Sequence, residues 1–365
     1  MKVLYTTTIG LTMIFFKSFI KQLIDNGHVV DIATNEDDYQ VDSCYRDWGC
    51  RIFHVSWSRS IFSTGNFSAV QEIRRIVNSG NYDIVHCHTP IAAACTRFAC
   101  KGFRKNGLKV IYTAHGFHFY KGAPLVNWVL FFPLEKICSR WTDVLITINQ
   151  EDYVLAQKKM KAGKIEYVPG VGIDINKFRN TFVDKNIKRD EIGVPKDAFL
   201  VLSVGELNPN KNHQIVLRSI AKMGDKNIHY AIAGKGNLED DLNKLSIDLG
   251  IEHQYHFLGY RNDVAELYKA ADIYALPSFR EGLNVSVMEA LASGLPCVVS
   301  KIRGNIDMVQ DGENGYYIDP SNIDSFSTAL IKASKLNNKI SISCSADKYS
   351  FNSINDYMMC LYLEG

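Results

Sequence analysis

The 365-residue sequence lacks the marks of several protein classes. Its nine cysteines are scattered, odd in number and without zinc-site spacing, which argues against a disulfide framework and against a structural zinc site. The longest aromatic-rich apolar run, residues 123–134, is too short to span a bilayer. The first residues resemble a strand more than a signal peptide. We therefore expect a protein of the reducing cytoplasm.

The sequence also lacks an excess of charge of one sign. Its 41 Lys and Arg residues against 39 Asp and Glu residues give a formal net charge of +2, which does not favour general nucleic-acid binding. No short-period repeat or low-complexity tract is present. The apolar fraction of 46% is typical of a soluble globular protein, and the length predicts two domains.

Short β-branched runs alternate with helical periodicity along the chain, which predicts an α/β fold. Several runs are almost continuously apolar, as in a parallel sheet covered on both faces. The predicted strands are 2–6, 29–34, 51–55, 84–86, 110–114 and 144–148, then 199–204, 229–233, 256–258, 273–276, 297–300 and 315–318. A helix is predicted over 12–26. Residues 169–195 break the alternation and suggest an inter-domain region between two doubly wound domains, 1–170 and 171–349.

Two such domains would place a ligand cleft at the carboxyl ends of their strands. In the first half, Gly10 precedes a helix, so its backbone could approach an anion or simply form a turn. His86, Cys87 and His88 invite a metal interpretation, but neighbouring strand residues point to opposite faces and no carboxylates accompany them. His115 stands at a strand end, where it could bond a sugar hydroxyl, act as a base or pack in the core.

The strand ends of the second half carry further candidates. Gly205 ends a strand, and Lys211 follows just ahead of a helix, where its compact charge would suit a phosphate. A surface lysine is the simpler alternative. The backbone around Tyr260 and Arg261 follows another strand and could contact the edge of a flat base.

The segment 280–300 is the most informative one. Glu281 lies in a glycine-containing turn, and Glu289 lies inside an apolar helix for which Asn284 is the expected N-cap. A buried carboxylate needs a partner, and the free N–H groups of Gly282, Leu283 and Asn284 would suit a phosphate. The pattern predicts a ligand with hydroxyls and a phosphate. A buried ion pair is the alternative, whereas a glycosidase pair would need glutamates facing each other across a sugar bond.

Taken together, these motifs resemble the family-4 retaining glycosyltransferases of the GT-B fold, close to members that make bacterial capsular polysaccharides and exopolysaccharides. The paired glutamates and the segments 115–118, 169–174, 205–211 and 312–315 occur in the expected order over nearly the whole chain. The resemblance implies two Rossmann-like domains facing across a cleft, with helix 350–365 crossing back to complete the first, acceptor-binding domain.

The resemblance also implies residue roles. His115, Lys211 and Glu281 would be catalytic: His115 near the reacting carbon, Glu281 on the transferred sugar and Lys211 on the diphosphate. The implied donor-binding residues are Gly10, Gly205, Tyr260, Arg261, Gly282, Leu283, Asn284, Glu289, which holds the ribose, and Arg303. No metal or other cofactor is expected, since no Asp-x-Asp turn is present and fixed positive groups can replace the metal.

One residue departs from the family pattern, because Glu206 stands where many relatives carry a phosphate-binding arginine. Arg303 could supply that charge, Lys211 and backbone amides could act alone, or the protein could be inactive. A further expectation concerns residues 125–134, whose aromatic side chains, flanked by Arg97, Lys101, Arg104, Lys105 and Lys109, would suit a bilayer face. These aromatics could equally be core.

The expected activity is transfer of a hexose or N-acetylhexosamine from a nucleotide sugar, with uridine diphosphate (UDP) leaving, to a saccharide or lipid-linked saccharide in capsule, exopolysaccharide or cell-surface glycan synthesis. We expect it in the cytoplasm or at the inner face of the membrane, without nucleic acid. The alternatives are a nucleotide-sugar epimerase of the same architecture and a catalytically silent sugar-nucleotide-binding subunit.

Overall fold

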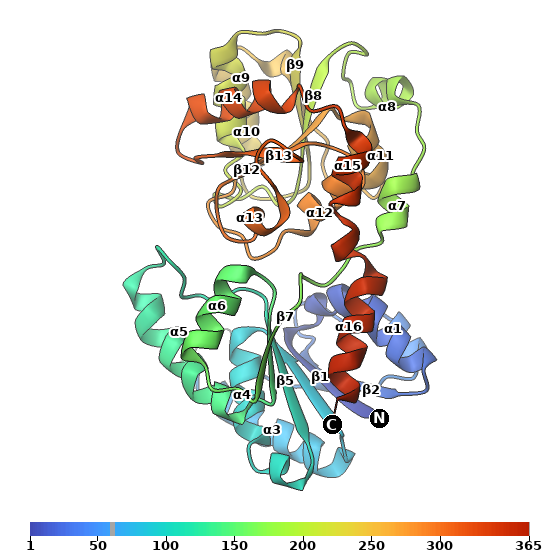
Figure 1. The fold of residues 1–365 in the computed structure, drawn as a ribbon, viewed down its shortest axis with the longest axis vertical. Helices are drawn as coiled ribbons and strands as arrows, with labels where there is room; N and C mark the ends of the chain where they lie inside the picture. Colours follow the sequence, from blue (N-terminus) through green and yellow to red (C-terminus); the bar gives the residue numbers. More distant parts are fainter. Residues whose placement is uncertain (59–62, 365) are drawn as a thin grey trace. The chain divides into compact units, whose positions relative to one another are not determined.

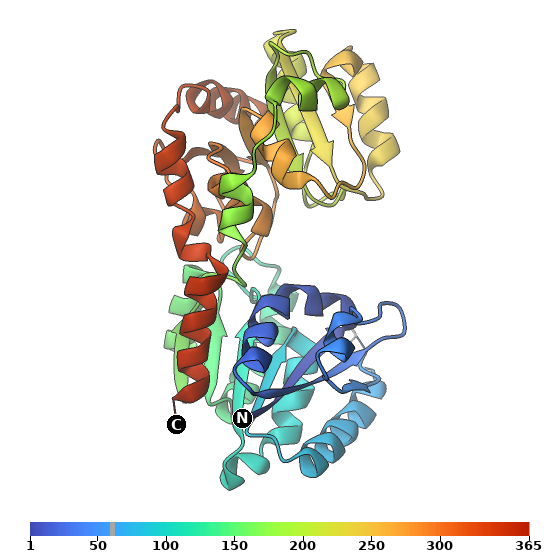
Figure 2. The same ribbon diagram turned by 90° about the vertical axis from the view of Figure 1, so that its right-hand side faces the viewer.

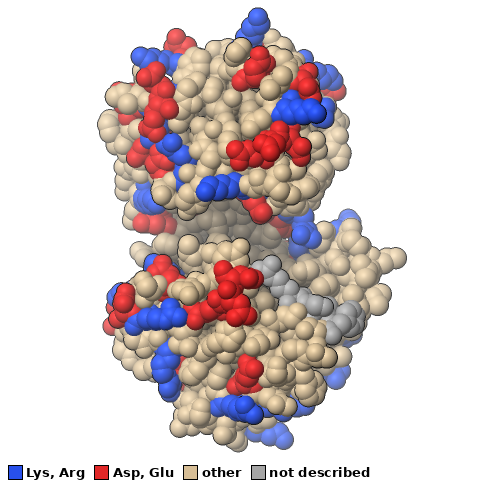
Figure 3. Space-filling view, turned by 180° about the vertical axis from the view of Figure 1, so that it is seen from behind, with Lys and Arg blue, Asp and Glu red and all other residues tan. Residues whose placement is uncertain are grey.

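The computed structural model describes residues 1–58 and 63–364, which form two compact units (Figures 1 and 2). Unit 1 comprises Met1–Val171 together with Ile354–Gly365, and unit 2 comprises Gly172–Ser353. On the face drawn in Figure 3, acidic and basic side chains are interspersed over each unit, as expected from the nearly balanced composition. Each unit is described separately below.

Unit 1 is built on a parallel sheet that has, in its described part, seven strands in the order β3-β2-β1-β4-β5-β6-β7. The strands are β1 Lys2–Ile9, β2 Val29–Asn35, β3 Ile52–His54, β4 Ile84–His88, β5 Lys109–Ala114, β6 Val144–Thr147 and β7 Lys164–Tyr167. The last strand is absent from the predicted set, because it lies at the sheet edge and has no fully buried residue. The strand order reverses between β1 and β4, where doubly wound sheets bind their ligands.

Helices pack on both faces of this sheet. The described helices of unit 1 are η1 Gly10–Phe16, α1 Lys17–Asp25, α2 Cys44–Asp47, α3 Gly65–Gly80, α4 Pro90–Cys100, η2 Phe103–Asn106, α5 Leu125–Cys138, η3 Ser139–Trp141 and α6 Gln150–Lys159, together with α16 Phe351–Leu363 from Ile354 onward. Val3 and Tyr5 pack in one core with α1 and α16, whereas Leu4 packs in another with α3 and α4. The alternation of side chains along β1 therefore gives unit 1 two hydrophobic layers.

Unit 2 repeats this plan with a six-stranded parallel sheet in the order β10-β9-β8-β11-β12-β13. The strands are β8 Phe199–Val204, β9 Ile228–Ala233, β10 Tyr255–Phe257, β11 Ile273–Leu276, β12 Cys297–Ser300 and β13 Gly315–Ile318. The helices are α7 Ile175–Asn180, α8 Lys185–Glu191, α9 Gln214–Met223, α10 Glu239–Asp248, η4 Glu252–Gln254, α11 Val264–Ala270, α12 Val285–Ala292, α13 Asn305–Met308, α14 Ile323–Ala333, α15 Lys339–Cys344 and η5 Asp347–Tyr349. All six strands coincide with predicted ones to within one residue.

Two predictions need correction. Residues 169–195, interpreted as an inter-domain region, do contain the boundary between the units, at Val171 and Gly172, but from Gly172 onward they belong to unit 2 and hold α7 and α8. They are anchored there by Arg189, which donates to Asp272 at 2.6 Å. The predicted helix 12–26 begins instead as the 3-10 helix η1 and becomes α-helical at Lys17. Among the described residues, no helix has the length and apolar character needed to cross a bilayer.

Candidate active site

Glycines hold the strand-end loops of unit 2 close together. A side chain on Gly234 would place its Cβ 1.8 Å from the carbonyl oxygen of Gly205, so the loop after β9 packs directly on the loop after β8. Gly304 has a φ of +78°, and its Cβ would lie 1.8 Å from the carbonyl oxygen of Gly282. These two contacts bring the turn before α12 against the loop after β12, and they explain why glycine is needed there.

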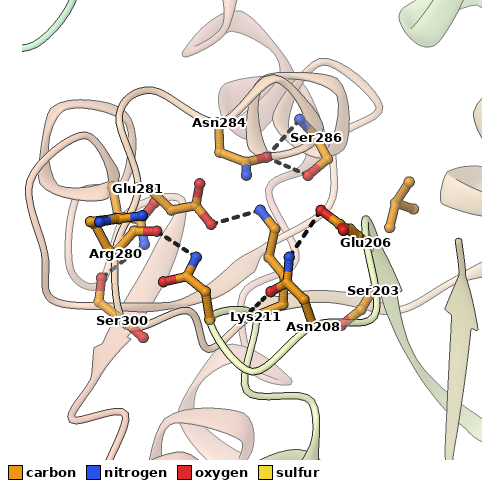
Figure 4. Close-up of polar contacts among 12 residues, drawn as sticks. Ser203, Glu206, Asn208, Lys211, Arg280, Glu281, Asn284, Ser286 and Ser300 are labelled. Atoms are coloured by element: carbon orange, nitrogen blue, oxygen red, sulfur yellow. Dashed lines mark hydrogen bonds and ion pairs between the residues drawn. The ribbon is translucent and has the colours of Figure 1, made fainter. Parts of the chain in front are cut away.

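Two predicted site residues, Lys211 and Glu281, form an ion pair (Figure 4). The Nζ atom of Lys211 donates to Oε1 of Glu281 at 2.7 Å, and the two side chains are only 15% and 11% exposed. Asn210 ties the same two loops together: its Nδ2 donates to the carbonyl of Arg280 at 2.9 Å. The ion-pair alternative therefore holds for Glu281, and its partner is the lysine that was expected to bind phosphate.

The start of α12 offers backbone donors. The predicted N-cap is confirmed, because Oδ1 of Asn284 accepts a hydrogen bond from the backbone N–H of Ser286 at 2.9 Å. Within the part of the chain that the structure describes, the N–H groups of Gly282, Leu283 and Asn284 donate to no other protein group. Such donors at a helix start favour an anion.

The second glutamate, Glu289, has a different environment from Glu281. Oε2 of Glu289 accepts a hydrogen bond from the Tyr268 hydroxyl at 3.0 Å, and no Lys or Arg of the described residues lies within ion-pair distance. Burial raises the pKa of Glu289 to about 7, because a low-dielectric environment disfavours its charge; the Tyr268 hydrogen bond acts in the opposite direction. A ligand that brings hydroxyls to this carboxyl would stabilise its ionised form.

Glu206 stands where many relatives carry a phosphate-binding arginine, and Arg303 could supply the charge instead. These two residues lie on different loops. Glu206 is exposed on the loop after β8, and its Oε2 accepts a hydrogen bond from Nδ2 of Asn208 at 2.9 Å (Figure 4). Arg303 is buried, with 8% of its surface exposed, and precedes Gly304, whose backbone touches the turn before α12. Arg303 is thus placed on a loop next to the helix start.

The predicted base-binding segment follows β10. Tyr260 is 67% exposed, and Nζ of Lys235 lies 5.8 Å from its ring centre. The Arg261 guanidinium is engaged by two carboxylates: its Nε donates to Asp263 at 2.8 Å, and its Nη2 pairs with Glu191 at 2.5 Å. The side chain of Arg261 is therefore engaged within unit 2, and contact between the backbone of this segment and a base stays a prediction.

In unit 1, the two predicted site residues lie in different settings. Gly10 is buried, and a Cβ there would lie 2.3 Å from the carbonyl oxygen of Tyr39, so packing alone accounts for this glycine. Its contact with phosphate stays a prediction. Nε2 of His115 lies 3.1 Å from Nδ1 of His88, and burial lowers the pKa of this half-buried histidine to about 4.

The other histidine of β4 is fully engaged by protein groups. Nδ1 of His86 lies 2.6 Å from the Tyr362 hydroxyl, and its Nε2 lies 2.8 Å from the Thr113 hydroxyl. The described residues contain no group of three His, Cys, Asp or Glu side chains arranged as metal ligands. The pairing of His88 with His115 was not predicted, because the two residues are 27 positions apart and meet only through the pairing of β4 with β5.

The aromatic segment forms α5 and divides between core and surface. Trp128, Phe131 and Phe132 are partly buried and join the core around Phe119, so the core alternative holds for them. The exposed apolar side chains of α5 include Leu125, Val126 and Val129, with exposures of 83%, 56% and 70%, and Ile137 at 49%.

The basic flank of this segment needs correction. Arg97 is fully buried, donates to Glu135 at 2.8 Å and lies with its guanidinium 4.0 Å from the Tyr112 ring centre. Lys109 donates to the backbone carbonyl of Leu361 at 2.7 Å. Both side chains are therefore engaged within unit 1. For Arg97 this is required, because a buried arginine needs a partner for its charge.

Comparisons with known proteins agree with this architecture. The Glycosyltransferase Family 4 model matches residues 14–177, and the model for glycosyl transferases group 1 matches residues 184–344. EpsD of Bacillus subtilis (strain 168) is 36% identical over 270 residues, which cover 73% of this chain and 71% of EpsD. The UDP-Gal:alpha-D-GlcNAc-diphosphoundecaprenol alpha-1,3-galactosyltransferase of Escherichia coli is 30% identical over 311 residues, 82% of this chain and 79% of that enzyme.

Solved structures share the fold over the full length. HepE of Anabaena, crystallised in complex with UDP, has a TM-score of 0.80 at 20% identity, with 99% of both chains covered. WaaG, a glycosyltransferase involved in lipopolysaccharide biosynthesis, has a TM-score of 0.75 at 18% identity, with 100% of both chains covered. The chain thus belongs to the GT-B glycosyltransferases, with a family 4 domain in its first half and a group 1 domain in its second.

Proposed function

We propose that this glycosyltransferase moves a hexose or N-acetylhexosamine from a UDP-sugar to a saccharide hydroxyl, with retention of the anomeric configuration. The observation that carries the proposal is the polar cluster at the strand ends of unit 2. There, a lysine, two carboxyls of different character and a helix start with unengaged N–H groups lie on adjoining loops. A nucleotide sugar presents the matching groups: a diphosphate, sugar hydroxyls and a ribose diol.

The diphosphate would lie at the start of α12. The N–H groups of Gly282, Leu283 and Asn284 would bind its oxygens, and Lys211 would approach from the loop after β8. Lysine has three donors, so Nζ can keep its bond to Glu281 and still donate to a phosphate. A fixed positive charge at this place stabilises the leaving group as its negative charge develops, which is the task a metal performs elsewhere. We propose no metal for this reaction.

The two glutamates would bind the two ends of the donor. Glu281, already oriented by Lys211, would accept hydrogen bonds from hydroxyls of the transferred sugar. Glu289 would accept the two ribose hydroxyls, which need a carboxyl that is not consumed by an ion pair. The different partners of the two carboxyls in the protein support these separate roles.

In the proposed reaction, the acceptor hydroxyl attacks the anomeric carbon on the face that the diphosphate leaves. The bond from the anomeric carbon to the phosphate oxygen breaks, the bond to the acceptor oxygen forms, and the leaving phosphate oxygen takes the acceptor's proton. No side chain has to become a covalent nucleophile in this scheme. Retention follows because attack and departure occur on one face of the sugar.

A lipid-linked acceptor is proposed from two observations. The Escherichia coli relative is named for a diphosphoundecaprenol-linked acceptor, and α5 exposes Leu125, Val126 and Val129. Side chains of this kind can enter the interfacial layer of a bilayer. The products would be capsular, exopolysaccharide or other cell-surface glycans made at the inner membrane face.

The test is a matrix of UDP-sugars against free and lipid-linked saccharide acceptors, scored by UDP release and by NMR of the product's anomeric proton. We expect acceptor-dependent UDP release and an α-linked product from an α-linked donor. An inverted product would overturn the retaining mechanism. UDP release without any acceptor would point to the epimerase, and donor binding without turnover would point to the silent subunit that Glu206 favours.

A further inference from the structure

The histidine pair of unit 1 allows a choice between two roles for His115, either a donor of a hydrogen bond or a base. His88 is the last residue of β4, and His115 directly follows the neighbouring strand β5. Their rings meet through Nδ1 of His88 and Nε2 of His115, which are 3.1 Å apart. This inference deepens the proposed function and rests on it, because it assumes that His115 contacts the donor sugar.

The ring of His88 is held rigidly. It is 1% exposed, stacks on Phe16 with ring centres 4.0 Å apart, and lies 4.1 Å from the His86 ring and 5.5 Å from that of Tyr5. Burial lowers the pKa of His88 well below its ordinary value, and the neighbouring His86 and His115 act in the same direction. No described carboxylate pairs with either ring of the His88–His115 pair. Both rings are therefore neutral, and each carries one proton.

The proton positions follow from the unengaged nitrogen of His88, which is buried. Nε2 of His88 is buried and has no hydrogen-bond partner among the described residues. If Nδ1 of His88 accepted the bond from His115, the proton of His88 would sit on Nε2 as an orphaned buried donor. Orphaned N–H groups are rarer in proteins than under-used acceptors. The favoured arrangement has Nδ1–H of His88 donating to Nε2 of His115, so that His115 carries its own proton on Nδ1.

We propose that His88 is a positioning residue that fixes His115 as a neutral ring with its Nδ1–H directed to the substrate. Nδ1 of His115 makes no hydrogen bond within the described part of the chain, so this donor is free for an oxygen of the transferred sugar. In this tautomer Nδ1 cannot accept a proton from the acceptor hydroxyl. His115 is then a hydrogen-bond donor and not the base, in keeping with a leaving phosphate oxygen that takes the proton.

The test compares His88→Leu, which removes the donor, with His88→Asn, whose Nδ2 can take the place of Nδ1. The matched control is Tyr362→Phe, which removes a hydroxyl from the same buried group, 2.6 Å from His86, without touching His115. In 15N-histidine NMR of the wild-type protein, we expect His115 to be protonated at Nδ1 and unprotonated at Nε2. This measurement needs no activity, so it stands even where no donor sugar is turned over.

The kinetic part is the pH profile of kcat. Without the donor at Nε2, His115 should take up a proton at a higher pH, so His88→Leu should shift the acid limb upward and lower kcat by roughly 10-fold or more, as expected when a catalytic group is misplaced. His88→Asn should return the acid limb of the kcat profile to its wild-type pH, and Tyr362→Phe should leave that limb unchanged. A His115 ring protonated at Nε2 in the wild type, or a His88→Leu profile identical to that of the wild type, would overturn the proposal. If the protein turns over no donor sugar but the NMR result is as expected, only the proposed function is rejected, and the protonation inferred for His115 stands.

Discussion

In unit 1 the ends of β4 and β5 carry histidines that are neutral, whereas in unit 2 the loops after β8 and β11 carry the charged residues Lys211 and Glu281. In unit 1, burial lowers the pKa of His86 to about 3 and that of His115 to about 4. In unit 2, Lys211 and Glu281 form a largely buried ion pair beside a helix start. The difference agrees with the proposed division of labour, in which unit 2 binds a charged nucleotide diphosphate and unit 1 contacts uncharged sugar hydroxyls.

A second contrast lies within unit 2, between two glutamates only eight positions apart. Glu281 has a cation at 2.7 Å, and Glu289 has a tyrosine hydroxyl at 3.0 Å. One residue type therefore supplies the partner of a lysine at one place and a carboxyl that titrates near neutrality at the other. Environment, and not residue identity, separates the two roles.

The largest expected effect comes from removing the charge of unit 2. Lys211→Ala should lower kcat by roughly 10²-fold or more, because the developing charge on the diphosphate would lose its fixed cation. Lys222→Ala is the matched control, since Lys222 forms an exposed ion pair with Asp324 and its side chain is 58% exposed. Steady-state kinetics with a UDP-sugar measure both variants. Wild-type turnover in Lys211→Ala would remove this lysine from leaving-group stabilisation.

The next effect concerns Glu289 and nucleotide affinity. Glu289→Ala should cost about 1–3 kcal/mol of UDP binding, because the ribose hydroxyls would lose a buried acceptor. Calorimetric titration with UDP measures the change. Tyr268→Phe keeps the carboxyl and removes its hydroxyl partner, so it controls for disturbance of the pocket. Unchanged UDP affinity in Glu289→Ala would exclude the ribose assignment.

The surroundings of Lys211 and Glu289 also show how much of the fold and the site the sequence could predict. In unit 2 the strand ends were placed to within one residue because β-branched runs are local signals, whereas β1 of unit 1 runs to Ile9, three residues past its predicted end. Asn284 was predicted as a cap from a local signal too. The Lys211–Glu281 pair spans 70 positions, and no local pattern reports a partner so distant. Arg97 was misassigned to the surface for that reason, since its partner Glu135 is 38 positions away.

The remaining errors have local physical causes. The edge strand β7 went undetected because its residues are only partly buried and carry no continuous apolar run. In α5 nearly every position is apolar, so periodicity could not separate Trp128, which packs in the core, from Leu125, which faces solvent. Patterns of hydrophobicity fix a buried face only where polar residues mark the opposite one.

A smaller effect is expected from pH. Because burial raises the pKa of Glu289 to about 7, roughly half of the unliganded molecules carry a neutral carboxyl at that pH. Ribose hydroxyls favour the ionised form, so UDP-sugar affinity should rise by about 10-fold from pH 6 to pH 8, with proton release. Calorimetry in two buffers of different protonation enthalpy measures that release. Glu289→Gln should abolish both effects, and a pH-independent wild-type affinity would contradict the assignment.

The Glu289 carboxyl should make the free energy of unfolding fall as the pH rises, whereas it makes the affinity for a UDP-sugar rise. Its pKa in the folded protein lies above the ordinary value of 4.5, so its contribution to stability is present below that value and is lost as the pH rises through 7. Urea unfolding of the unliganded wild-type protein and of Glu289→Gln, each at pH 5 and pH 8, would measure this contribution to the free energy of unfolding. The variant should lose less stability than the wild type over that range.

The smallest effect comes from Glu206, the residue that departs from the family pattern. Glu206→Arg would replace an exposed negative charge by a positive one on the loop that carries Lys211, and it should strengthen UDP-sugar binding by about 3-fold, since exposed charges act weakly through water. The gain should shrink at high salt. Asn208→Ala controls for the lost hydrogen bond to Glu206, and Glu206→Gln should fall between the wild type and the arginine variant. Unchanged binding by Glu206→Arg would mean that the diphosphate lies away from this side chain, and the charges that unit 2 offers it would then be those of Lys211 and the helix start alone.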